Sequence, residues 1–215
     1  MDSIKRSKTR KVLAHLLWPV VPIVIVGGLK YPLLGLAAPV VMLMGAIGGI
    51  FRGRYVCGWL CPRGAFFDRI MGLISPKKEI PPLFRNYILR WAIFILLMGL
   101  VAFQIARVPT DINHLGKVFV RICIITTSAG ILLAIIYHPR AWCSLCPMGT
   151  LQSVVGGQKL PLHMEDGCRE CRICEASCPI GLKIVGNIKD GKLDSKDCLK
   201  CPECALSCPK NILHF

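Results

Sequence analysis

Acidic side chains are scarce in this sequence. Asp and Glu number 12 against 27 Lys and Arg, and the formal net charge is +15. Hydrophobic residues make up 53% of the chain, which excludes an ordinary soluble protein of this charge and favours a membrane protein with a small soluble domain. The sequence also lacks an acid–base pair, a nucleotide-binding loop and a nucleophile elbow, so it has no motif of an enzyme that acts alone.

The basic residues gather at the ends of apolar runs. Five of them lie within the first eleven residues, and residues 52–90 contain eight against two acids. Loops rich in Lys and Arg stay on the cytoplasmic side of a membrane, so this distribution indicates topology and disfavours nucleic acid as a partner. We therefore expect a multi-pass protein of the cell membrane, with its amino terminus in the cytoplasm and residues 107–117 on the outer face.

Four apolar runs are long enough to cross hydrocarbon about 30 Å thick. They predict spans at about 12–29, 32–51, 87–106 and 118–138, arranged as two helical hairpins. Gly45, Gly49 and Gly53 form a smooth stripe that favours close helix packing. Residues 65–75 have their apolar side chains spaced for one helix face and are expected to lie in the interface plane. The lone Cys123 is expected to be a small buried hydrophobe.

The last fifty residues contain eight cysteines in two copies of C-x2-C-x2-C-x3-C-P. Three closely spaced thiolates suit one corner of an iron–sulfur cubane, and the fourth is directed at the other cluster. Zinc sites pair two C-x2-C knuckles and do not require this third cysteine. The pattern predicts two 4Fe-4S clusters with crossed ligation: Cys168, Cys171, Cys174 and Cys208 for the first, and Cys198, Cys201, Cys204 and Cys178 for the second.

Residues 168–215 resemble the bacterial-type two-cluster ferredoxins. A small hairpin is expected between the two copies, from residues 183–185, the Asp190-Gly191 turn and residues 192–193. The expected architecture is an α-helical membrane domain at 1–159 followed by an α+β ferredoxin domain at 160–215. Reduced thiolates place that domain in the cytoplasm.

Four further cysteines form a second constellation. They occur in R-x-x-C motifs that continue to L-C-P-x-G, at Cys57 and Cys61 and again at Cys143 and Cys146, so the repeat has a period of 85 or 86 residues. Each copy follows two spans, and a two-fold axis along the membrane normal would bring all four to the cytoplasmic face. Nearby arginines lower thiol pKa and favour a third metal or iron–sulfur site. Packed structural thiols or a redox-active dithiol pair are the alternatives.

The chain resembles the NapH, NosR and CcoG group of membrane-bound polyferredoxins in the order of its parts. That order is two spans, the CGWLCP motif, two further spans, a second cysteine-proline pair and a two-cluster ferredoxin. The likeness is greatest to small NapH-like members, although their second motif keeps three residues between its cysteines and Cys143 and Cys146 enclose two. The resemblance implies electron transfer between the membrane quinone pool and a redox partner enzyme. The protein would then be an electron-transfer subunit of an oxidoreductase, of the quinol dehydrogenase kind, with no catalytic residue of its own.

Two other functions are compatible with the residues. One is a redox-active assembly or sensor protein that supports maturation of a metalloenzyme, as CcoG-like and NosR-like relatives suggest. The other is a haem-bearing quinol oxidase, which would rest on His15 and His138 near cytoplasmic helix ends. Isolated histidines in such places are commonly interfacial side chains.

Overall fold

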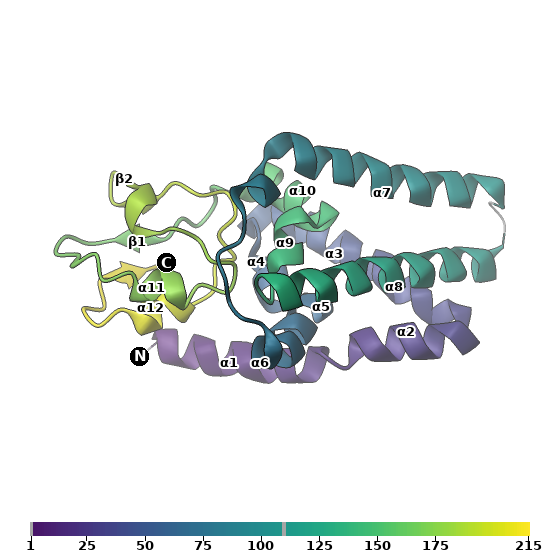
Figure 1. Ribbon diagram of the computed structural model, residues 1–215, viewed down its shortest axis with the longest axis horizontal. Helices are drawn as coiled ribbons and strands as arrows, with labels where there is room; N and C mark the ends of the chain where they lie inside the picture. Colours follow the sequence, from purple (N-terminus) through teal and green to yellow (C-terminus); the bar gives the residue numbers. More distant parts are fainter. Residues whose placement is uncertain (1, 109–110) are drawn as a thin grey trace.

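Long apolar helices and a cysteine-rich carboxyl-terminal region make up the chain, in a computed structural model that describes residues 2–108 and 111–215. Four helical segments of the described residues are long and apolar enough to cross a membrane. In Figure 1 they extend to one side of the molecule and the ferredoxin-like region lies at the opposite end. The expected fold class, a helical membrane protein with a ferredoxin domain, is confirmed.

The first segment consists of α1 (Asp2–Leu17) and α2 (Val20–Lys30). Pro19 lies between them, and a proline has no backbone N–H to continue the helical ladder, so the segment breaks there. The second segment is a 3-10 turn, η1 (Pro32–Leu36), followed by α3 (Ala37–Arg52). Helix α1 therefore begins well before the expected first span and runs beside the short helices and the ferredoxin-like region (Figure 1).

The third and fourth segments are α7 (Tyr87–Arg107) and α8 (Ile112–Ile136). Each is capped by a side chain: Asn86 accepts from the Ile88 amide and Asp111 from the Asn113 amide, both at 2.9 Å. Such caps satisfy amides at a helix start. Because Asp111 caps α8, that helix begins at Ile112 rather than near residue 118.

The stripe of small residues on α3 packs closely against α10 (Pro147–Gly156). A Cβ at Gly49 would lie 2.9 Å from Cγ of Gln152, and Gln152 donates from Nε2 to the Gly45 carbonyl at 2.8 Å. Gly53 ends the helix with a φ of +61°, a conformation that favours glycine. The expected packing role of the stripe is confirmed.

Short helices follow each pair of spans. After α3 these are α4 (Tyr55–Trp59), α5 (Pro62–Phe66), a π-helical turn η2 (Phe67–Met71), α6 (Gly72–Ile74) and η3 (Pro82–Arg85), and after α8 they are α9 (Ala141–Leu145) and α10. Phe67 is 0% exposed and packs with Met71, Ala134 and Trp142. Phe67 and Met71 are therefore directed into the protein, while Ile74 of the same face is 66% exposed. The position of residues 65–75 in the interface plane stays a prediction.

The carboxyl-terminal region combines a small antiparallel sheet with α11 (Ile173–Ala176), η4 (Val185–Asn187) and α12 (Glu203–Ser207). The strand order is β2-β3-β1-β4, from β1 (His163–Met164), β2 (Ile188–Lys189), β3 (Lys192–Leu193) and β4 (Leu213–His214). Asp190 and Gly191 form the β2–β3 turn with φ of 50° and 70°. The hairpin exists, but its first strand is 188–189 and not the expected 183–185.

Candidate metal centres

The two cysteine-proline motifs adopt the same local structure. Arg54 and Arg140 immediately precede the short helices α4 and α9, and Cys61 and Cys146 take extended backbone with ψ of 112° and 132°. The proline after each of these cysteines begins the next helix, where its missing N–H has no helical partner to lose. The sequence repeat is thus a repeat of structure, although the cysteine spacing differs.

The arginine of each motif donates a hydrogen bond to the backbone carbonyl of the first cysteine in the other motif. Arg54 donates from Nη2 to the Cys143 carbonyl at 2.7 Å, and Arg140 donates from Nη1 to the Cys57 carbonyl at 3.1 Å. Arg54 is 0% exposed and Arg140 is 2% exposed. The contacts are reciprocal, as expected if the two halves are related by an approximate two-fold axis.

The glycine of each motif makes room for the arginine of the other. A Cβ at Gly149 would lie 2.7 Å from Nη2 of Arg54, and a Cβ at Gly64 would lie 3.2 Å from Cζ of Arg140. The L-C-P-x-G pattern therefore has a packing explanation, because a side chain at either glycine would displace a buried guanidinium group.

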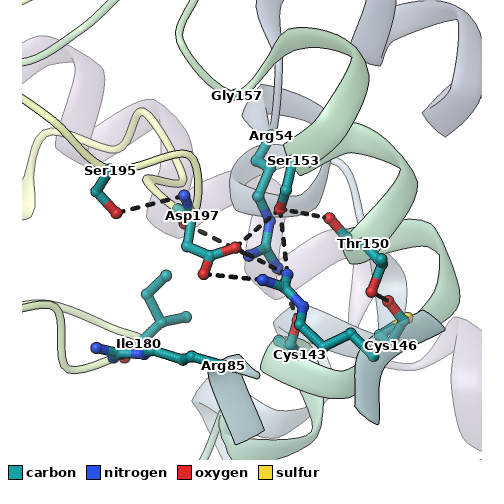
Figure 2. Close-up of polar contacts among 12 residues, drawn as sticks. Arg54, Arg85, Cys143, Cys146, Thr150, Ser153, Gly157, Ile180, Ser195 and Asp197 are labelled. Atoms are coloured by element: carbon teal, nitrogen blue, oxygen red, sulfur yellow. Dashed lines mark hydrogen bonds and ion pairs between the residues drawn. The ribbon is translucent and has the colours of Figure 1, made fainter. Parts of the chain in front are cut away.

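Asp197 joins the membrane helices to the ferredoxin-like region (Figure 2). Its Oδ1 accepts from Arg54, Arg90 and the Ser153 hydroxyl, each at 2.8 Å, and its Oδ2 accepts from Arg90 at 3.0 Å. Burial by itself raises the pKa of the Asp197 carboxyl, but the Arg54 charge and the donors Arg90 and Ser153 outweigh it and lower the pKa to about 2. This carboxylate directly precedes Cys198, so the ion pairs fix the start of the second ferredoxin motif.

A second carboxylate, Asp68, ties the other side of the interface together. It accepts from Arg140 at 2.6 and 2.7 Å and from Arg10 at 2.8 Å, and Arg10 also pairs with Glu203 at 2.8 Å. The Asp68 charge raises the pKa of Arg140 against the lowering effect of burial. Sequence reasoning missed these pairs. The sequence offered one signal for Asp68, which is the scarcity of acidic residues around it. Asp68 is one of only two acids among eight basic residues in residues 52–90.

The arginines around the membrane-face cysteines (Cys57, Cys61, Cys143 and Cys146) outnumber the carboxylates. Arg63 has no carboxylate partner in the described part of the chain, and its Nη2 lies 3.6 Å from Sγ of Cys123. Five arginines and three carboxylates meet in this interface: Arg10, Arg54, Arg63, Arg90 and Arg140 with Asp68, Asp197 and Glu203. A four-thiolate centre, whether zinc or 4Fe-4S, carries roughly two net negative charges, so the donor set and its surroundings fit such a group.

The four cysteines lie close enough to influence one another. Burial raises the pKa of the Cys57 thiol, Arg54 opposes the rise, and Cys61, Cys146 and Cys143 add to it. Burial likewise raises the pKa of Cys143, to about 12. Cys57, Cys61 and Cys146 line a cavity of about 170 Å³, whereas Cys143 packs against the core around Phe67.

The eight ferredoxin cysteines divide between two further cavities. Cys178, Cys198, Cys201 and Cys204 line one, and Cys168, Cys171, Cys174 and Cys208 line the other. These are the two crossed sets expected from the spacing. As the side chains stand, no three His, Cys, Asp or Glu residues of the described chain form a ready ligand group, so a metal would have to draw the thiols together.

The cavity of Cys198 adjoins the membrane-face motifs, and the cavity of Cys168 lies away from them. Trp59 donates from Nε1 to the Lys200 carbonyl at 3.1 Å, and Cys57 packs against the buried core that contains Leu199. Cys168 is exposed to solvent. The two expected clusters would therefore differ in position, one internal and one at the surface.

Comparison with known proteins places this arrangement in a family. A protein-family model described as a 4Fe-4S binding domain matches residues 34–81 and 121–163 of the sequence, and each matched stretch contains one cysteine-proline motif. The chain is 30% identical over 183 residues to the uncharacterized protein MJ0750 of Methanocaldococcus jannaschii, covering 77% of this chain and 73% of that protein. The chain belongs to the NapH/NosR-like membrane-bound 4Fe-4S proteins.

Other members of the NapH/NosR-like family are similar over less of their length. The ferredoxin-type protein MauN of methylamine utilization, from Methylorubrum extorquens, is 28% identical over 60% of this chain and 48% of its own. The regulatory protein NosR of Pseudomonas aeruginosa is 25% identical over 73% of this chain and 24% of its own. No solved structure matches the chain. Family and fold together identify an iron–sulfur protein of the electron-transfer type with membrane-spanning helices.

Proposed function

We propose that this protein relays electrons between a quinol in the bilayer and a redox partner on the cytoplasmic side. The observation that carries the proposal is the cavity of about 170 Å³ that connects apolar span residues to the membrane-face cysteines. Val21, Val24 and Phe119 line it together with Cys57 and Cys61. A lipid-soluble redox molecule in this cavity would meet the thiols without crossing the ferredoxin domain.

Two polar side chains suit the headgroup of such a molecule. Gln152 lines the cavity, and its buried Oε1 has no hydrogen-bond partner in the described part of the chain. Arg63 lines the same cavity without a carboxylate partner. A quinol hydroxyl would donate to Gln152, and a quinone carbonyl would accept from Arg63. A buried polar atom that lacks a partner is costly, so a ligand that supplies one is favoured.

Three metal sites form part of the proposal. The first ferredoxin cluster would be held by Cys168, Cys171, Cys174 and Cys208, the second by Cys198, Cys201, Cys204 and Cys178, and the membrane-face site by Cys57, Cys61, Cys143 and Cys146. A 4Fe-4S cluster carries one electron with little rearrangement. The contact of Cys57 with the core around Leu199 and the exposure of Cys168 support an order from the membrane-face site through the Cys198 set to the Cys168 set. In this proposal the membrane domain comprises residues 1–159 and the ferredoxin domain residues 160–215.

Iron content and quinol reduction test the relay. The protein is purified anaerobically into nanodiscs, and a variant has Cys57, Cys61, Cys143 and Cys146 changed to serine. The matched control is Cys123→Ser, which removes a thiol from the same region but from none of the predicted ligand sets. We expect about twelve irons in the wild type and control and about eight in the variant, from four irons per cubane. Quinol should reduce the clusters of the wild type and not those of the variant. Cys123→Ser serves as the control for iron content alone, because Cys123 lines the same cavity.

A second variant separates the headgroup site from the metal site. Gln152→Leu should leave iron content and chemical reduction by dithionite unchanged and slow reduction by quinol by about tenfold, the value of one hydrogen bond of roughly 1.4 kcal/mol. If about twelve irons are present and quinol never reduces them, the proposed electron source is wrong. The assembly or sensor function then becomes the better account.

A further inference from the structure

A second, larger cleft lies outside the electron path. Its volume is about 630 Å³, and it is enclosed by α1, the junction of α3 and α4, and loops of the ferredoxin-like region. Its principal lining residues are four cations and two aromatic residues: Lys5, Arg6, Arg52, Lys200, Tyr55 and Trp59. Leu160, Thr9, Pro202 and Phe215 complete the wall, so the lining contains no acidic residue.

Three of the four cations of this cleft, Lys5, Arg6 and Arg52, are exposed, and Lys200 is buried. Among the side chains that the structure describes, none of the four forms an ion pair with a carboxylate. The three carboxylates of the interface, Asp68, Asp197 and Glu203, are engaged by other arginines. Positive charge in a concave, partly enclosed site attracts an anion.

The inner wall of the cleft is held in place by its own contacts. Tyr55 and Trp59 stack with ring centroids 5.1 Å apart, and the Arg52 guanidinium lies 5.5 Å from the centre of the Tyr55 ring. Lys200 is only 5% exposed, and its Nζ donates to the Gly157 carbonyl at 3.0 Å. A cationic site that is ordered before binding loses less conformational entropy when an anion arrives.

We propose that this cleft binds a phosphate group. Arg52 is the last residue of a helix long and apolar enough to span a membrane, which sets the cleft at one end of the spans, at the level of the phospholipid headgroups. Its open side equally admits a soluble phosphate compound. Phosphate suits the site because Arg and Lys bind its oxygens through charge-assisted hydrogen bonds. The inference is independent of the proposed relay, since none of the lining residues is a metal ligand.

The test compares two variants of the full-length protein, one with three cations of the cleft replaced and one with two cations outside it replaced. The cleft variant is Lys5→Gln, Arg6→Gln, Arg52→Gln. The control is Lys8→Gln, Lys11→Gln, two exposed cations of the same helix that do not line the cleft. Unchanged visible absorbance of the iron–sulfur clusters shows that each variant is folded. Nanodiscs contain phosphatidylcholine alone or an equal mixture with phosphatidylglycerol.

Two measurements distinguish the sources of phosphate. Native mass spectrometry from mixed nanodiscs reports retained phosphatidylglycerol, and calorimetry in phosphatidylcholine nanodiscs reports binding of inorganic phosphate. Binding by the wild type and control, weakened at least about tenfold in the cleft variant, supports the site, because each cation near a membrane surface contributes about 1 kcal/mol. Retention of the lipid alone assigns a headgroup, and saturable binding of phosphate assigns a soluble ligand. If the cleft variant and the wild type behave alike in both measurements, the inference is overturned.

Discussion

Replacing Asp197 with Asn should loosen the attachment of the ferredoxin-like region to the membrane helices. The change keeps the shape of the side chain but removes the charge shared by Arg54 and Arg90. A carboxyl pKa lowered from 3.8 to about 2 corresponds to roughly 2–3 kcal/mol of stabilisation. Because the folded-state pKa is the lower one, this stabilisation is present at neutral pH and is lost only as the pH falls from about 4 towards 2.

The assay is denaturant unfolding at neutral pH, followed by the visible absorbance of the clusters. We expect Asp197→Asn to lower the free energy of unfolding by about 2–3 kcal/mol, and hydrogen exchange to rise at the loop that begins with Cys198. The matched control is Asp194→Asn, since Asp194 forms an exposed pair with Lys189 that contributes little. A double-mutant cycle with Arg90→Gln should give a coupling of about 1–3 kcal/mol. A loss below about 0.5 kcal/mol, or no coupling, would refute the argument.

Three further predictions concern the metal sites and the topology. Cys174→Ser should remove one cluster and destabilise the whole ferredoxin-like region, because metal binding supplies folding energy; unchanged iron content and electron paramagnetic resonance signals would contradict this. Gly149→Ala should destabilise the fold by about 1–3 kcal/mol, since its Cβ would meet Nη2 of Arg54 at 2.7 Å, whereas Gly99→Ala, with open space around it in a helix interior, should not destabilise the fold. Reporter fusions after Lys78 and at the carboxyl terminus should be cytoplasmic and one near His114 external, and a reversed pattern would refute the topology.

Local patterns in the sequence were sufficient to predict the four spans. Hydropathy depends on consecutive residues, and the C-x2-C-x2-C-x3-C-P spacing assigns cysteines to the same two groups that line the two cavities. The side of a helix that meets the protein is a tertiary property, which explains why the packing of Phe67 against Ala134 and Trp142 was not predicted. The periodicity of residues 65–75 reveals an apolar face but not its partner.

Long-range ion pairs could not be predicted in the same way. Arg90 and Asp197 are 107 positions apart, and Arg10 and Glu203 are 193 apart, so no local pattern links them. The reciprocal arginine contacts were partly accessible, because the repeat placed both motifs at one face. The roles of their glycines became clear only when the guanidinium groups were located.

The reciprocal contacts of Arg54 and Arg140 have a consequence for biosynthesis. Arg54 lies in the first half of the chain, but its carbonyl partner belongs to Cys143 and its carboxylate partner to Asp197. A ribosome that has released the first hairpin into the membrane has therefore made only half of the membrane-face pocket, with a buried cation that has neither partner. The pocket closes after residue 197 has been synthesised. Loading of the proposed metal at this face would then be a late step of maturation, and a chain truncated before Asp197 should insert all four spans yet leave this pocket incomplete.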